Sequence, residues 1–362
     1  MPFHATYPFN LPLLPPHVSL DDTAITKAVL DARVKLAELN GLTFSLPNPF
    51  LLFSPAIIKE SIASSEIENI HTTVLNVLES QLFPEDEQKK PDKEVLKYRE
   101  AVLWGFEERK QIPISSRLIT GIHKKLLPEL LGSFRTTQNA IVDGRTKEII
   151  YTPPLQKDIP VLMGNLENFI HQQLGSTMPD WDPLIRIAIA HYQFESIHPF
   201  NDGNGRTGRI LMVLQLLEHR ILSWPTLYIS GYINRNKNQY YQHLRDITRE
   251  EKWKEFVLFM LQGFAEQATE TTLLALNIKN LFFAQKNELK TNFKKIYTTD
   301  LLEAFFAFPI ITPIKLGHEL GVHYGTASRY LTQLEKGGFL QGKWVGKYHF
   351  FANTKLLKLI HG

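Results

Sequence analysis

Apolar residues recur at helical spacing through most of the chain. Between Asp21 and Asn40 they return every three or four positions, which is the period of a helix with one buried face. Asp21 and Asp22 are alternative N-caps for this helix, because an aspartate carboxylate accepts a backbone N–H of the first turn. Its apolar positions are Ile25, Val29, Leu30, Val34, Leu36 and Leu39.

The same spacing predicts a mainly α fold. A buried helix is expected from Ile210, with helices continuing through residue 285. Residues 1–20 are rich in proline, which lacks an amide donor and clashes with the preceding helical turn, so we expect them to lie extended over the next domain. The other expected helices are 54–81, 92–110, 115–127, 156–174 and 182–195.

A β-hairpin interrupts the helical pattern at residues 138–151. The run AIVDGRTKEIIY places two segments rich in β-branched residues on either side of Asp143 and Gly144. An Asp-Gly pair between two such segments is typical of a hairpin turn. The sequence therefore predicts a hairpin set into a helical domain.

The last 67 residues look like a separate small domain. Residues 285–295 are polar and contain lysines, which indicates a linker or an exposed helix end. Residues 299–351 then resemble a winged helix, with two helices, a turn at Gly321, a further helix and wing strands at 339–351. Its expected core positions are Leu316, Leu320, Val322, Ala327, Leu331 and Leu334.

The basic residues of this domain make nucleic acid one candidate partner among others. Arg329, Lys336, Lys343 and Lys347 are placed to contact phosphates, but a winged helix also serves as a protein-binding or spacing domain. The net charge of +3 is too small to argue for nucleic-acid binding over the whole molecule.

Composition narrows the classes of protein and site. The chain is 43% hydrophobic and 21% charged, as in ordinary globular proteins. It has no cysteine, which excludes disulfides, thiolate nucleophiles and thiolate zinc sites and fits a reducing compartment. The N-terminal stretch lacks the basic start of a signal peptide, and no apolar run approaches the roughly 18 residues of a membrane helix. We therefore expect a cytoplasmic protein without a membrane partner.

The segment from Ile197 to Arg209 carries the most specific chemistry. Its glycines allow backbone amides to approach an anion closely, and the positive N-terminal end of the following helix favours a bound phosphate. Arg206 and Arg209 lie three residues apart and are able to clamp outer phosphates from one side. Asp202 offers the hard oxygen that Mg²⁺ prefers. Composition thus predicts a phosphate cradle.

Other phosphate loops fit the segment less well. Gly203, Gly205 and Gly208 form a GxGxxG string, but the dinucleotide version follows a strand, whereas the residues before His198 read as a helix. A Walker loop requires Gly-Lys-Ser/Thr, which is missing. A purely structural turn would not need a histidine and two arginines.

The segment HPFNDGNGRTGR resembles the Fic motif HxFx[DE]GNGRxxR and matches it at every defined position. The surrounding runs HYQFESIHPF, GSFRTTQNAI to YTPP, and NQYYQHL are also similar to Fic domains, so that the resemblance covers roughly residues 50–265. It implies a Fic helical bundle with a hairpin flap. Together with the resemblance of the last residues to a winged helix, it divides the chain into an N-terminal helical region at 1–110, a catalytic domain at 111–285 and a winged helix at 296–362.

This resemblance implies a protein adenylyltransferase. Such an enzyme transfers AMP from Mg-ATP to a Ser, Thr or Tyr hydroxyl of a target protein or of itself, and pyrophosphate leaves. His198 would take the hydroxyl proton, Phe200 would anchor the loop, and Asp202 would hold Mg²⁺ on the phosphates. The implied ATP-binding residues are Gly203, Asn204, Gly205, Arg206, Thr207, Gly208 and Arg209.

Two further elements of the family have less specific counterparts. Tyr240 and Tyr241 resemble a tyrosine pair that lines the base pocket, and Tyr241 is our candidate, although core packing of one of the two is equally compatible. The hairpin of 138–151 resembles the flap that holds a target by strand addition; a hairpin that only covers the site is the alternative.

Ser64, Glu68 and Asn69 match the Fic inhibitory pattern [ST]xxxE[GN] in the expected helix 54–81. The resemblance implies that Glu68 pairs with Arg209 and occupies the place of the γ-phosphate. ATP would then bind only in an unproductive pose. The alternative is an ordinary solvated helix charge.

Several alternative functions remain open at this stage. One is a DNA-binding regulator whose Fic domain only senses nucleotide, and another is a Fic enzyme that removes AMP or transfers a different phosphate-containing group. His198 and both arginines favour AMP transfer, because a sensor needs no base. A homodimer is retained as a candidate assembly.

Overall fold

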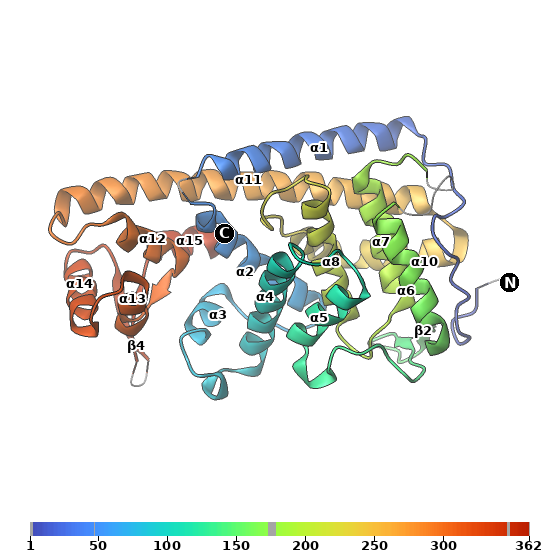
Figure 1. Ribbon diagram of the computed structural model, residues 1–362, viewed down its shortest axis with the longest axis horizontal. Coiled ribbons are helices and arrows are strands. Elements are labelled where there is room, and N and C mark those ends of the chain that lie inside the picture. Colours follow the sequence, from blue (N-terminus) through green and yellow to red (C-terminus); the bar gives the residue numbers. More distant parts are fainter. Residues whose placement is uncertain (1–2, 47, 173–178, 346–347, 362) are drawn as a thin grey trace.

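Two long helices form the spine of the molecule. The computed structural model describes residues 3–46, 48–172, 179–345 and 348–361. Helix α11 (Trp253–Asn292) is 40 residues long, which corresponds to about 60 Å. Helix α1 (Thr23–Phe44) lies along it (Figure 1). Asp22, rather than Asp21, caps α1, because its carboxylate accepts the N–H of Ala24 at 2.7 Å.

The predicted helical bundle lies below this spine (Figure 1). Helix α8 is buried almost all round, from Arg206 to Leu217, as expected of a helix at the centre of a domain. Three single-turn 3₁₀ helices, η1 (Glu85–Glu87), η2 (Pro128–Leu130) and η3 (Gln156–Asp158), connect parts of the bundle. Its α-helices are α4 (Lys90–Glu108), α5 (Ser116–Leu126), α6 (Ile159–Ile170), α7 (Pro183–Ile197), α8 (Asn204–Glu218), α9 (Ser230–Arg235) and α10 (Lys237–Glu250).

Helix α8 begins six residues before the predicted start at Ile210. Gly203 precedes it with φ 78°, a left-handed conformation that favours glycine. Arg206 and Arg209 therefore lie on the first turns of α8 and not in a loop before it. The free backbone N–H groups of this helix end lie within the motif itself.

The expected single helix 54–81 is two helices. Helix α2 (Phe50–Ile67) ends where Asn69 adopts φ 62°, which asparagine tolerates better than most residues. Helix α3 (Val74–Ser80) starts again after Thr73, whose side chain accepts the N–H of Asn76. Glu68 is thus the C-cap of α2 and is not in a helix interior.

The predicted hairpin is confirmed, with a wider loop than expected. Strands β1 (Ile141–Val142) and β2 (Ile149–Tyr151) are antiparallel. The loop extends from Asp143 to Glu148, and the Asp143 carboxylate accepts two backbone N–H groups within it. The N-terminal segment lies against this hairpin, because the N–H of Phe9 donates to Thr152 O at 2.9 Å.

The C-terminal module, residues 296–361, has the element order that the sequence predicts, with two additions. Gly321 ends α13 with φ 63°. A short strand β3 and a final helix α15 were not predicted; β3 joins the sheet in the order β3-β5-β4. Gly346 and Lys347 lie outside the described residues. The elements are α12 (Thr299–Ala307), β3 (Ile310–Ile311), α13 (Pro313–Leu320), α14 (Tyr324–Lys336), β4 (Gln341–Val345), β5 (Tyr348–Ala352) and α15 (Thr354–His361).

Residues 285–295, expected to be a linker or an exposed helix end, are largely the end of α11, which is partly buried against the module (Figure 1). Gln285 is buried there and exchanges two hydrogen bonds of 2.9 Å with Asn353. A second apolar cluster joins the module to α2 and α3 through Ile58, Leu78, Ile310 and Phe350. In the described part of the chain, no helix is both long and apolar enough to span a bilayer.

Candidate active site

His198 stands at the sharp end of helix α7. It adopts φ 49° and ψ 58°, a left-handed conformation, while its N–H still donates to Phe194 O at 3.1 Å. With the ring Nδ1–H donating to Glu195 O at 3.3 Å, Nε2 is the unprotonated nitrogen. The backbone thus turns away from the helix and the imidazole keeps one basic nitrogen.

Burial lowers the pKa of His198 to about 4. The hydrogen bond to Glu195 O opposes this effect, and the positive charge of Arg135 adds to it. A free histidine has a pKa of about 6.5, close to the working pH. In the folded protein the imidazole is therefore neutral throughout the physiological range and free to accept a proton, although its lowered pKa makes it a weaker base than a free histidine.

Two side chains fix the loop that follows His198. The Asn204 amide accepts the N–H of Phe200 and donates to its carbonyl, both at 2.8 Å. The His123 ring stacks on buried Phe200, with ring centres 3.8 Å apart, and its Nε2 is 2.8 Å from Asp202 O. Phe200 is a core anchor, as expected, whereas sequence reasoning missed His123, which lies 79 residues from Asp202.

The glycines of the motif lie where side chains would not fit. A Cβ on Gly203 would be 2.7 Å from Leu127, and a Cβ on Gly205 would be 2.6 Å from the Glu68 carboxylate. A Cβ on Gly208 would collide with the Glu195 carboxylate. The side chain of Thr207 between them is fully buried. Backbone and carboxylates therefore approach each other closely along the start of α8.

Arg206 faces two carboxylates. Its guanidinium, 4% exposed, lies 3.2 Å from Glu94 of α4 and 3.9 Å from Asp202. Asp202 is exposed, and its other oxygen accepts the N–H of Gly203 at 2.6 Å. Among the described residues no group of three or more His, Asp or Glu side chains is placed to hold a metal on its own. One exposed carboxylate does suit a Mg²⁺ that is bound mainly by substrate phosphates.

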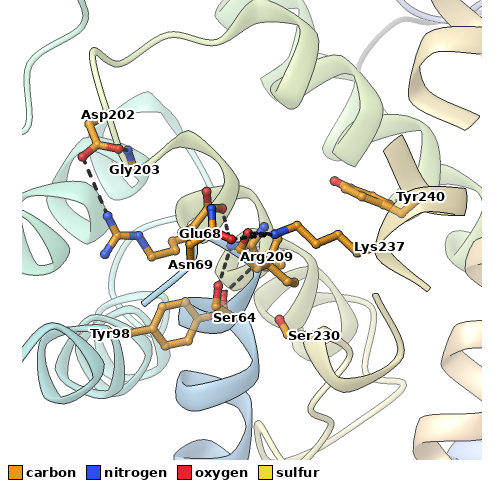
Figure 2. Close-up of polar contacts among 12 residues, drawn as sticks. Ser64, Glu68, Asn69, Tyr98, Asp202, Gly203, Arg209, Ser230, Lys237 and Tyr240 are labelled. Carbon is orange, nitrogen blue, oxygen red and sulfur yellow. Dashed lines mark hydrogen bonds and ion pairs between the residues drawn. The ribbon is translucent and has the colours of Figure 1, made fainter. Parts of the chain in front are cut away.

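Two residues of the inhibitory pattern, Ser64 and Glu68, hold Arg209 (Figure 2). Its Nη2 donates to Glu68 Oε1 at 2.8 Å and to Ser64 O at 3.0 Å, and its Nε donates to Ser64 Oγ at 2.8 Å. The guanidinium is 2% exposed and the Glu68 side chain 35%. Burial opposes ionisation of Glu68, but the charge and hydrogen bond of Arg209, together with the charges of Arg206 and Lys237, outweigh it, so that the pKa of the carboxyl is lowered. The structure thus brings together Ser64, Glu68 and Arg209.

Asn69, the third residue of the pattern, hydrogen-bonds to Lys237 and not to Arg209 among the described residues. Its Oδ1 accepts a hydrogen bond from Lys237 at 3.4 Å, and the same ammonium donates to Ile67 O at 2.5 Å (Figure 2). A cation at this place satisfies the free carbonyls at the end of α2 and complements the helix dipole. Lys237 therefore secures the segment that carries Glu68, a role the sequence did not reveal.

A buried carboxylate one turn before Ser64 anchors the same helix. Glu60 accepts hydrogen bonds from the hydroxyl of Tyr98, at 2.8 Å, and from the N–H of Ser230, at 3.0 Å. Burial raises its pKa. Glu60, Ser64 and Glu68 recur every fourth residue on α2, a spacing that was visible in the sequence but was not used.

The two neighbouring tyrosines, Tyr240 and Tyr241, have different surroundings. Tyr240 is buried and its hydroxyl shares a 2.7 Å hydrogen bond with Nε2 of His191, so it belongs to the core. Tyr241 is partly buried, with its ring 5.3 Å from that of Tyr240. The more accessible ring is the one we expected to meet the nucleotide base.

Glu195 adds a strongly perturbed carboxyl beside α8. Its Oε1 has no hydrogen-bond partner among the described residues. Burial raises its pKa to about 7, the charge of Arg209 opposes this, and Glu68 adds to it. A carboxyl whose pKa rises on folding binds its proton more tightly in the folded state, so its ionisation costs stability above pH 4.5.

We expect Glu195→Gln to stabilise the protein at pH 8 and to change little at pH 4. A pKa raised from 4.5 to about 7 corresponds to about 3 kcal/mol. Urea unfolding of both proteins across this pH range measures the difference, which should grow between pH 4.5 and 7 and then stay level. A pH-independent difference would contradict the assignment.

Comparisons with known proteins agree with this geometry. Residues 26–107 match the N-terminal region of the Fic/DOC family, and residues 113–216 match the Fic/DOC family itself. Residues 281–356 match the C-terminal domain of SoFic-like protein adenylyltransferases. The chain carries a Fic/DOC domain. The Fic match contains both His198 and Arg209.

Curated relatives of this Fic chain are larger proteins. Protein adenylyltransferase Fic of Drosophila yakuba is 32% identical over 167 residues, which are 45% of this chain and 29% of the relative. The Culex quinquefasciatus protein of the same name is 32% identical over 156 residues, 42% of this chain and 27% of the relative. The chain thus aligns with less than a third of the length of these relatives.

Solved structures share the fold of the Fic chain. A Fic family protein from Desulfovibrio desulfuricans G20 superposes with a TM-score of 0.59 at 20% identity, and covers 93% of this chain and 98% of its own. Fic-1 (aa134 - 508) from C. elegans has a TM-score of 0.51 at 19% identity, over 68% of this chain and 71% of its own.

Proposed function

We propose that this chain is a protein adenylyltransferase that transfers AMP from Mg-ATP to a hydroxyl side chain and is inhibited by Glu68. The observation that carries the proposal is the ion pair between buried Arg209 and Glu68. Arg209 lies in the first turns of α8, shortly after His198 with its basic Nε2. Curated relatives that share this region are named protein adenylyltransferases.

The chemistry requires one base and a cradle for negative charge. His198 Nε2 accepts the proton of the target hydroxyl while the hydroxyl oxygen bonds to the α-phosphorus of ATP, and the bond from that phosphorus to pyrophosphate breaks. Arg206 and Arg209 neutralise charge on the departing phosphates. Asp202 would hold Mg²⁺ on these phosphates, where the ion supplies further charge neutralisation.

The hairpin of β1 and β2 would present the target. Val142 is 47% exposed and Ile149 39% exposed, so apolar side chains of both strands are available to a partner. A target segment that added to the hairpin edge would gain backbone hydrogen bonds independently of its sequence. We propose that this flap selects an extended segment with an exposed Ser, Thr or Tyr.

The test of the function uses ATP labelled at two positions. The Glu68→Gly variant is incubated with α-labelled ATP or γ-labelled ATP, and label on protein is followed. AMP transfer predicts label from the α position alone. Label from the γ position would indicate phosphoryl transfer, and the absence of both would remove the proposed activity.

For the C-terminal module we propose a winged helix that supports the inhibitory region. Lys343 of β4 lies 3.0 Å from Glu79 of α3, so this cation is already paired. Arg329 and Lys336 of α14 are exposed and remain the candidates for contact with DNA. The apolar cluster with α2 and α3 favours a role in supporting the helix that carries the inhibitory residues. DNA binding remains the second candidate function of the module.

We expect Phe350→Ala to destabilise the protein by about 3–5 kcal/mol, because its ring is buried in the same apolar cluster as Ile58 and Leu78. Trp344→Ala, at an exposed wing position, is the matched control and should cost much less. Urea unfolding compares the two. Equal losses would show that the cluster does not hold the module against α2 and α3.

The pH dependence of transfer should report the lowered pKa of His198. In the Glu68→Gly variant we expect kcat/KM to fall only as the pH decreases toward about 4, because the free enzyme's imidazole stays neutral above that. A decline centred near pH 6.5 that persisted after Glu195→Gln would contradict the buried environment of the base.

A further inference from the structure

Arg135 lies immediately before the flap, and within the described residues all of its hydrogen bonds go to backbone carbonyls. Its guanidinium donates through Nε to His198 O at 2.9 Å, through Nη1 to Thr137 O at 3.2 Å, and through Nη2 to Pro154 O at 2.5 Å. Its own N–H donates to Pro199 O at 2.8 Å. The residue is 2% exposed. Removing a charge from water is costly. We therefore take the buried guanidinium to fix the positions of the carbonyls that it binds.

The carbonyls that Arg135 contacts belong to two different parts of the site. Thr137 and Pro154 stand at the two ends of the hairpin segment, and His198 carries the basic nitrogen. The left-handed turn at His198 takes its carbonyl out of the regular α7 pattern, so it needs another donor. The rigid fork of the guanidinium supplies donors in fixed directions to all three carbonyls.

We propose that Arg135 is a positioning residue that fixes the flap relative to His198, so that a hydroxyl held by the flap meets the base at the correct distance. The inference rests on the proposed function. A second contact also joins the flap to the end of α7: the hydroxyl of Tyr151 in β2 donates to Ser196 O at 2.8 Å. The flap and the end of α7 are therefore joined at both ends of the residues 196–198.

A merely structural role makes different predictions from a positioning role. If Arg135 only stabilised the fold, its loss would weaken ATP binding and transfer together. If it positions the flap, the cradle on α8 keeps its affinity for Mg-ATP while the transfer step slows. A misplacement of about 1 Å between reacting groups can cost roughly 100-fold in rate.

The experiment compares Arg135→Gln and Arg135→Lys in the Glu68→Gly background. Arg186→Gln is the matched control, because Arg186 is a buried arginine on α7 twelve residues before His198. Three quantities are measured: label transfer from α-labelled ATP at saturating ATP, the melting shift produced by Mg-ATP, and amide hydrogen exchange of residues 138–154 and 196–200.

We expect Arg135→Gln to slow transfer by roughly 10- to 100-fold while the Mg-ATP melting shift stays that of the parent. Exchange should become faster in both segments together. Arg135→Lys should recover part of the rate, because an ammonium still donates to carbonyls but lacks the fork. Arg186→Gln should leave transfer and the exchange of both segments unchanged.

The positioning role is overturned by transfer at the parent rate, by loss of the ATP-dependent shift in step with the rate, or by faster exchange in the hairpin alone. If the Glu68→Gly parent transfers no label, the proposed function fails. The exchange of the two segments still decides whether Arg135 couples them.

Discussion

His198→Ala abolishes measurable label transfer while ATP binding stays nearly intact. The imidazole lies at the end of α7 and acts on the attacking hydroxyl, whereas residues 202–209 form the cradle for the phosphates. Loss of a general base typically costs about 10² to 10⁴ in rate. Transfer is measured with α-labelled ATP, and binding by the melting shift that Mg-ATP produces.

His123→Ala is an informative companion to this variant. His123 does not reach the reacting atoms in our proposal, but it stacks on Phe200 and holds Asp202 O. We therefore expect His123→Ala to weaken Mg-ATP binding, whereas His198→Ala should leave this binding nearly unchanged. Transfer by His198→Ala at the wild-type rate would remove this histidine from the mechanism.

Glu68→Gly raises transfer by roughly tenfold to a hundredfold. The change removes the carboxylate that Arg209 binds at 2.8 Å and frees the guanidinium for a γ-phosphate. Breaking a well-ordered arginine–carboxylate pair is worth several kcal/mol when both groups are buried, and less here because Glu68 is a third exposed. About 1.4–2.8 kcal/mol corresponds to the expected change in rate.

The stability of Glu68→Gly should fall, but not through helix propensity. Glu68 is the C-cap of α2, with φ −89° and ψ 15°, so the cost of a glycine in a helix interior does not apply. The loss comes from Arg209, which stays buried without its carboxylate. Bound Mg-ATP restores a counter-charge, and the variant should therefore gain more in melting temperature from Mg-ATP than the wild type does.

Glu66→Gln is the control for this variant. Glu66 lies two residues earlier on α2 and accepts a hydrogen bond from Asn234 at 2.8 Å, away from Arg209. It should leave transfer and the ATP-dependent shift unchanged. Activation by Glu66→Gln to the level of Glu68→Gly would mean that any loosening of α2 releases the enzyme, and that the Glu68 carboxylate is not the inhibitor.

The sequence predicted those parts of the site that lie close together along the chain. The residues from His198 to Arg209 form a continuous segment, so its composition alone indicated a phosphate cradle. The distant partner Glu68 was found only because the inhibitory pattern resembles that of Fic proteins. Helical periodicity also located most helices, since each has one face buried in the core.

What the sequence did not reveal depends on contacts between distant residues. Arg135 and His123 bind backbone carbonyls 63 and 79 residues away, and a carbonyl carries no sequence signal. The break between α2 and α3 depends on a left-handed Asn69, which a continuous apolar pattern conceals. The early start of α8 was missed because three glycines in a motif suggest a loop, although Gly205 and Gly208 are helical.

One side-by-side measurement tests the central claim that Glu68 restrains an AMP transfer that depends on His198. Wild type, Glu68→Gly and the double variant Glu68→Gly/His198→Ala are incubated with α-labelled ATP and Mg²⁺ under identical conditions. We predict strong protein label with Glu68→Gly, at least tenfold less with wild type, and none above background with the double variant. Equal label with wild type and Glu68→Gly, or undiminished label with the double variant, would contradict it.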